Sequence, residues 1–326
     1  MFALVASAAS PDECAFLAKR FSAFPQPGRG AWKRVFVNAT FEPRADGPRH
    51  YPTADDIFKL FYHGRRSPYH GMQQHADPRA ALRKLTFSFA TKYGGPITEW
   101  VLQALGGPPT FAVEVGSYLG SSAVRTWGPL VRRSSGGLLL CIDTWTGDLR
   151  MRLVPTVKAV YESLWYGGAG HAHGPRGHPV LFDKFLQTVV DANMTDTVFP
   201  LPAPSILGAR LLATTSWEID LIFVDSAHES GETLIEIHLF YQLLKPGGVL
   251  LGDDYDEFPA VRDDVQTFAA CQGLKVETPT RNTWALVKPS TAPREPRGPL
   301  GHGGADGSDW VRPRNWDYGP VGAAPH

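Results

Sequence analysis

Four short apolar runs constrain the fold of this chain more than any other feature. They are FAVEVG, LLLCID, IDLIFVD and GGVLLGDD, which occupy residues 111–116, 138–143, 219–225 and 247–254. Runs this short and this continuously apolar are typical of parallel strands that are buried on both faces. The segments between them have helical character and are long enough for crossover connections. We therefore predict an α/β fold built on a doubly wound, mostly parallel sheet.

The sequence pattern divides the chain into three parts. Residues 1–95 give mixed signals and are expected to form a cap on the substrate side. Residues 96–288 contain the four runs and are expected to form the main domain. Residues 289–326 are rich in Pro and Gly and are expected to form a disordered tail. Within these parts we predict helices at Asp12–Phe21, Asp55–His63 and Thr98–Ala104, and strands at Arg34–Phe41 and Thr197–Leu201.

Charge and cysteine content exclude several classes of protein. Lys and Arg number 32, as do Asp and Glu, and no long basic patch is present, which argues against a nucleic-acid-binding protein. No apolar run approaches the roughly 20 residues of a membrane-spanning helix. Cys14, Cys141 and Cys271 are widely spaced and odd in number, so no disulfide framework or zinc site is expected. Reduced thiols and a cytoplasmic location are the prediction.

The apolar runs all lead into an acid or a Gly-rich turn. In an open parallel sheet, ligands bind outside the carboxyl ends of the strands. The first run continues as VEVGSYLGSSA (Val113–Ala123), in which Gly116 and Gly120 would let the backbone approach a ligand closely. This spacing is not that of a dinucleotide enzyme or a P-loop. Glu114 would suit a cationic ligand, although a tight turn with glycines for packing explains the stretch equally well.

Asp143 ends the second run and is followed by Thr144 and Trp145. A carboxylate there can accept hydrogen bonds from two ribose hydroxyls, and the aromatic ring can stack on an adenine. The alternative is an Asp that caps the next helix.

Three further carboxylates follow the last two runs: Asp225, Asp253 and Asp254. Grouped at neighbouring strand ends, they would repel one another strongly without a cation. Oxygen ligands of this kind suit Mg²⁺. The alternative is that one or two of them cap helices or hold loops.

The stretch VEVGSYLGSS followed by CIDTWTGD resembles the cofactor motifs of class I S-adenosylmethionine-dependent methyltransferases, over about residues 110–288. The first motif is similar to that of catechol-type O-methyltransferases, and the second more closely resembles sugar and macrolide O-methyltransferases of the macrocin and mycinamicin type. The resemblance implies a Rossmann-like fold. It also implies a cofactor site formed by Glu114, Gly116, Ser117, Tyr118, Gly120, Ser122, Asp143, Thr144, Trp145, Ser205 and Ser226.

The resemblance also gives His228 a role. Metal-dependent members have their general base three residues after the first metal-binding acid, a lysine in the catechol type and a histidine in the macrolide-sugar type. This chain has His228 there, and Asp254 where the catechol type has an asparagine. Asp225, Asp253 and Asp254 would hold Mg²⁺, which makes the acceptor hydroxyl more acidic. His228 would then take its proton.

We therefore expect an O-methyltransferase that acts on a hydroxyl of a small molecule, a sugar or another natural product. The expected cofactors are S-adenosylmethionine and Mg²⁺, with no nucleic-acid or membrane partner and a possible homo-oligomer. Two alternatives remain: a relative of the cephalosporin hydroxylases with the same cofactor site, and a non-catalytic S-adenosylmethionine-binding domain. The histidine-rich stretch at residues 167–179 is interpreted as a lid over the substrate.

Overall fold

The computed structural model of this chain describes residues 11–12, 14, 49–64, 66–84, 95–147 and 180–291. The predicted strand at Arg34–Phe41, the histidine-rich stretch and all but the first three residues of the predicted tail lie outside these ranges. Only residues 12 and 14 of the helix predicted at Asp12–Phe21 are described, and both are helical.

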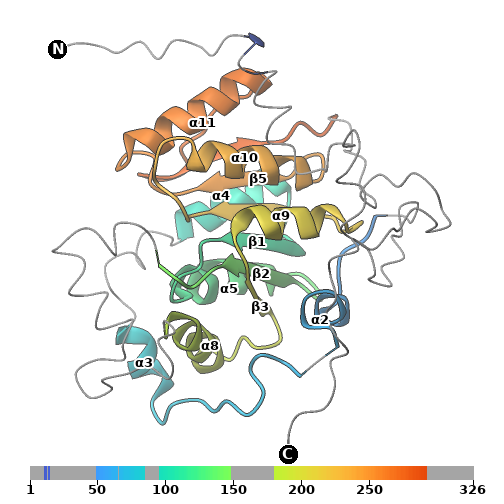
Figure 1. Cartoon of the computed structure of the whole chain (residues 1–326), viewed down its shortest axis with the longest axis vertical. Helices are drawn as coiled ribbons and strands as arrows, with labels where there is room; N and C mark the ends of the chain where they lie inside the picture. Colours follow the sequence, from blue (N-terminus) through green and yellow to red (C-terminus); the bar gives the residue numbers. More distant parts are fainter. Residues whose placement is uncertain are drawn as a thin grey trace, which may run out of the picture.

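A six-stranded sheet forms the centre of the molecule, in the order β3-β2-β1-β4-β5-β6 (Figure 1). The first five strands run parallel, and β6 pairs antiparallel with β5. This confirms the predicted doubly wound, mostly parallel α/β fold. The strands are β1 (Phe111–Val115), β2 (Leu138–Asp143), β3 (Val198–Pro202), β4 (Leu221–Val224), β5 (Val249–Gly252) and β6 (Trp284–Val287).

The register of the strands brings their carboxyl ends to one edge. Val115 of β1 lies beside Ile142 of β2 and Val224 of β4. Val224 in turn lies beside Gly252 of β5. The loops that follow these four strands therefore meet, as the sequence pattern predicted.

Helices cover both faces of the sheet, and each face has its own apolar core (Figure 1). One core includes residues of α2 (Ala54–Tyr62), α9 (Ser205–Ala213), α10 (Glu232–Leu243) and α11 (Pro259–Gln272). The other includes residues of α4 (Gly95–Leu105), the π-helical turn η2 (Ala123–Trp127), α5 (Gly128–Val131) and α8 (Leu181–Asp191). The predicted helices at Asp55–His63 and Thr98–Ala104 correspond to α2 and α4.

Within the N-terminal region, helix α2 and residues 66–84 lie against the β3 side of the sheet. Helix α2 begins with a capping box, in which Thr53 and Asp56 exchange hydrogen bonds. The Tyr69 hydroxyl donates to the Val198 carbonyl oxygen of β3 at 2.7 Å. A short helix, α3 (Pro78–Lys84), packs against α8. No helix among the described residues combines the length and apolar character needed to cross a membrane.

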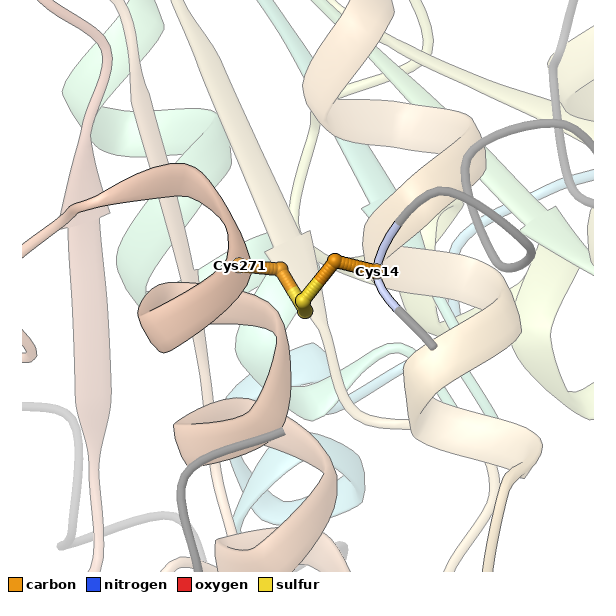
Figure 2. The surroundings of a disulfide bond; sticks show 2 residues. All are labelled: Cys14 and Cys271. Atoms are coloured by element: carbon orange, nitrogen blue, oxygen red, sulfur yellow. A yellow bond between two sulfur atoms is a disulfide. The ribbon is translucent and has the colours of Figure 1, made fainter. Parts of the chain in front are cut away.

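A disulfide joins Cys14 to Cys271, in the last turn of α11 (Figure 2). The expectation of three reduced cysteines and no disulfide was therefore wrong. The two partners are 257 residues apart, and spacing along the sequence carries no information about a contact made by the folded chain. Cys141, in β2, is free and buried.

Candidate functional site

The loop after β1 takes a left-handed path at three positions, with φ of 83° at Gly116, 46° at Tyr118 and 82° at Gly120. A Cβ atom at Gly116 would lie 2.0 Å from the carbonyl oxygen of Asp225, and one at Gly120 would lie 3.0 Å from the Phe185 ring. Both glycines are therefore required by contacts within the protein, which favours the packing interpretation of the stretch. Their contact with a cofactor stays a prediction.

Glu114 supports this loop from inside the sheet. Its side chain is fully buried, and its Oε2 atom accepts a hydrogen bond from the Cys141 Sγ at 3.4 Å. Burial raises the pKa of the Glu114 carboxyl to about 7, and the nearby side chains of Ser122, Ser117 and Cys141 oppose the rise. We therefore interpret Glu114 as an anchor for the loop and not as a group that faces solvent.

Asp143 ties the loop after β2 to the loop after β1. Its Oδ2 atom accepts from the backbone N–H groups of Ser117 and Tyr118, at 2.9 and 2.8 Å, and its Oδ1 atom accepts from that of Trp145 at 2.6 Å. Burial raises the pKa of the carboxyl, and these backbone donors oppose the rise. The Thr144 backbone N–H opposes the rise as well, so backbone donors take up nearly all of the roughly four acceptor positions of this carboxylate. Hydrogen bonds to ribose hydroxyls stay a prediction.

Trp145 is buried beside this carboxylate. Its ring centroid lies 4.8 Å from those of Phe182 and Phe185, and its indole N–H donates to the Tyr118 carbonyl oxygen at 2.8 Å. Stacking on an adenine, as the sequence suggested, would require the ring to leave this packing, and it stays a prediction. Thr144 is exposed and exchanges a hydrogen bond with Thr146.

An acidic cluster lies at the carboxyl ends of β4 and β5. One side-chain donor atom each from Asp225, His228 and Asp254 lies within 4.8 Å of the others. The His228 Nε2 atom is 2.5 Å from the Asp254 Oδ2 atom. The ring of Phe258 packs at 4.8 Å from the imidazole. Two carboxylates and an imidazole at this spacing can bind a divalent cation, or can hold and orient a proton between them.

Asp253, the third predicted metal ligand, lies next to this cluster but is absent from the set of three donors. Its Oδ1 atom accepts a hydrogen bond from the Asn282 Nδ2 at 3.0 Å. Sequence reasoning missed Asn282, because it lies in the loop before β6, an antiparallel edge strand that was not among the predicted runs.

Ser205 and Ser226 both hydrogen-bond to Glu236 of α10, which sequence reasoning also missed. The Ser226 Oγ atom donates to the Glu236 Oε2 atom at 2.5 Å, and the Ser205 hydroxyl is a second neighbour. Burial raises the pKa of Glu236 to about 7, and the two serines oppose this rise. The structure thus brings these two serines of the predicted cofactor site together through a buried acid.

Comparison with known families identifies the centre of this site. Residues 113–255 match a family model described as a methyltransferase domain. The matched segment begins within β1 and ends just after Asp254, so it contains the loop after β1, Asp143 and the acidic cluster. The match confirms, for this segment, the resemblance to class I methyltransferases.

Comparison with solved structures finds O-methyltransferases. One from Bacillus cereus, solved in complex with SAH, is 14% identical with a TM-score of 0.41, over 72% of this chain and 98% of that one. NovP is 16% identical with a TM-score of 0.43, over 60% and 80%. A putative O-methyltransferase from Klebsiella pneumoniae is 14% identical with a TM-score of 0.39, over 67% and 92%. No curated protein matches the chain.

Proposed function

We propose that this chain, whose residues 113–255 match a family model described as a methyltransferase domain, is an S-adenosylmethionine-dependent O-methyltransferase assisted by a divalent metal such as Mg²⁺. Its acceptor is a hydroxyl of a small molecule, a sugar or another natural product, and not a nucleic acid or a membrane lipid. The observation that carries the proposal is the cluster of Asp225, His228 and Asp254 beside the loop after β1.

The loop after β1 fits the cofactor. The Ser121 hydroxyl oxygen is buried and has no hydrogen-bond partner among the described residues, so the loop retains a polar group for a ligand. Asp143 orders the same loop by accepting from the backbone N–H groups of Ser117 and Tyr118. These residues, with Ser117 and Tyr118, would hold the cofactor, which supplies an electrophilic methyl group when it is bound.

The acidic cluster fits a divalent metal. Asp225 and Asp254 offer carboxylate oxygens from neighbouring strand ends, and such oxygens are the ligands that Mg²⁺ prefers. Asp253 would support them from the adjacent position. A metal held there would act as a Lewis acid that makes a nearby hydroxyl more acidic.

His228 is the group placed to take the acceptor's proton. Its Nε2 atom faces the Asp254 Oδ2 atom at 2.5 Å, and an adjacent carboxylate fixes the orientation of an imidazole and stabilises its protonated form. The packing of Phe258 on the imidazole restricts its rotation. A histidine at this position, together with Asp254, supports an aliphatic or sugar hydroxyl over a catechol.

The first test is isothermal titration with S-adenosylhomocysteine, in Mg²⁺ and in EDTA. Binding that survives EDTA is expected, because the cofactor loop and the acidic cluster use different residues. Absence of binding in both conditions would overturn the methyltransferase proposal.

His228→Ala separates catalysis from binding. We expect unchanged affinity for S-adenosylhomocysteine and a loss of turnover of about 10²–10⁴-fold, the usual contribution of a general base. Methyl transfer would be followed with labelled S-adenosylmethionine and a panel of sugars and polyols. Wild-type turnover by this variant would remove His228 from the mechanism. Cofactor binding without any turnover by the unaltered protein, across the panel, would favour a non-catalytic binding domain.

A further inference from the structure

Asn282 connects the loop before β6 to the acids that follow β5. Its side chain is 5% exposed. Its backbone N–H donates to the Asp256 Oδ2 at 3.1 Å, and its carbonyl oxygen accepts from the Tyr255 N–H at 3.0 Å. Every polar group of this residue is directed at residues 253–257, the segment that carries Asp253 and Asp254.

The side-chain amide has one defined orientation. Its Oδ1 atom accepts from the backbone N–H groups of Asp256 and Glu257, at 2.9 and 2.8 Å. The Nδ2 atom must therefore be the one that faces the acids. It donates to the Oδ1 atoms of Asp253 and Asp254, at 3.0 and 3.4 Å.

Asp254 is thus held by both of its carboxylate oxygens. Asn282 donates to Oδ1, and His228 lies at 2.5 Å from Oδ2. The backbone of Asp254 is left-handed, with φ of 67°, a conformation that is uncommon outside glycine and costs free energy unless surrounding contacts maintain it. The hydrogen bonds from Asn282 to the next residues supply such contacts.

An amide suits this position because it is a neutral donor. A lysine or arginine would neutralise the two carboxylates and compete with a cation. An aspartate would add a third like charge beside them. The amide orders the acid pair and leaves its negative charge available.

We propose that Asn282 is a positioning residue that presents Asp253 and Asp254 for divalent-metal binding. The inference rests on the proposed function, because it assumes that the acidic cluster binds a metal. Partners of metal ligands typically change metal affinity by about 10–100-fold when they are removed.

The test is Asn282→Gly, since glycine accepts the positive φ of 67° at this residue. The matched control is Asn193→Gly, at φ of 53° after α8. With Mn²⁺ as the probe and S-adenosylhomocysteine present, isothermal titration is expected to show affinity weakened about 10–100-fold in Asn282→Gly and unchanged in Asn193→Gly. The affinity of both variants for S-adenosylhomocysteine should equal that of the unaltered protein.

The outcomes separate the two proposals. Equal Mn²⁺ affinity in Asn282→Gly and the unaltered protein would overturn the role of Asn282 and leave the proposed function intact. An unaltered protein that binds S-adenosylhomocysteine but no Mn²⁺ would reject both the metal and the role of Asn282. If Asn282→Gly lost affinity for both Mn²⁺ and S-adenosylhomocysteine, the specific role of Asn282 in metal binding would be overturned as well.

A second measurement needs no change at Asn282. The chain has four asparagines, at positions 38, 193, 282 and 315, so ¹⁵N-asparagine labelling gives four pairs of side-chain amide signals, one pair for each asparagine. Variants of the other three assign the signal of Asn282 by elimination. Titration with Mg²⁺ should shift that signal and not the signal of Asn193. A stationary Asn282 signal under conditions where titration calorimetry shows Mg²⁺ binding would overturn the proposal.

Discussion

At the scale of single residues, buried carboxyl groups dominate the chemistry of this molecule. Glu114 and Glu236 lie on different sides of the site, and burial raises the pKa of each to about 7. Neighbouring serine side chains oppose this rise in pKa at both carboxyls. At a pH between about 4.5 and 7, the folded protein therefore keeps a proton on each of these two carboxyls. In the unfolded chain each carboxyl has its ordinary pKa of 4.5 and has already released that proton.

Glu236→Gln is expected to remove part of the pH dependence of stability. Between about pH 4.5 and 7 the folded state holds the Glu236 proton and the unfolded state does not, so the free energy of unfolding of the unaltered protein falls as pH rises through this window. The free energy of unfolding of the variant, relative to that of the unaltered protein, should therefore rise by up to about 3 kcal/mol from pH 4 to pH 8. Urea unfolding at both pH values measures this difference.

Glu232→Gln, which alters an exposed carboxyl one turn earlier in α10, is the control. Because the charge of Glu232 is only a minor cause of the raised pKa of Glu236, this variant should show a much smaller gain. A difference between Glu236→Gln and the unaltered protein that is the same at pH 4 and pH 8 would contradict the raised pKa.

The sequence could predict which acids lie at the strand ends but not which partners they have. Asp225, His228 and Asp254 follow two recognisable strands, so their proximity follows from the parallel sheet. Asn282 and Glu236 reach the site from a loop and a helix whose packing only the tertiary structure defines. The carboxylate of Asp143 was correctly placed at the sheet edge, but its backbone donors depend on left-handed residues that no periodic pattern reveals.

At the scale of elements, the close approach of two strand ends shapes the site. The loop that leaves β1 at Gly116 lies against the backbone of Asp225, just after β4. Both strands were predictable from their apolar runs, since burial on two faces leaves a continuous pattern. Strand β6, which pairs antiparallel at the edge of the sheet, was not among the predicted runs.

Gly116→Ala should destabilise the protein strongly. The new Cβ would lie 2.0 Å from the Asp225 carbonyl oxygen at a residue with φ of 83°, so both the backbone and the strand pair must shift. We expect a loss of at least about 3 kcal/mol in the free energy of unfolding. Thermal or urea unfolding measures it.

Gly136→Ala is the matched control. Gly136 has φ of 70°, and nothing lies within 4 Å of an added Cβ. Its substitution therefore has the backbone strain of Gly116→Ala without the steric clash, and it should cost about 1–2 kcal/mol in the free energy of unfolding. Equal losses at Gly116 and Gly136 would show that the contact with Asp225 is not tight.

At the scale of the whole molecule, the Cys14–Cys271 disulfide joins the N-terminal region to α11. Such bonds persist in oxidising compartments and are rare in the cytosol. This argues against the cytoplasmic location predicted from the sequence, and the location itself stays a prediction.

Alkylation of the denatured, unreduced protein should label one of the three cysteines, Cys141. Cys14→Ser should expose two thiols, because Cys271 loses its partner. Reduction is expected to lower the free energy of unfolding by about 2–4 kcal/mol, since it frees a long loop in the unfolded chain. Three labelled thiols in the unaltered protein would show that the bond does not form.

The disulfide also has a mechanical consequence. It closes a covalent ring from residue 14 to residue 271, which encloses β1 to β5 and leaves β6 outside. Tension applied at the two ends of the chain would pass through the sulfur atoms and could not stretch the enclosed strands. The first part of the sheet to peel away would be β6, with Asn282 just ahead of it, so a pulling force would break the hydrogen bonds from Asn282 to the two acids after β5 while the five parallel strands stayed paired.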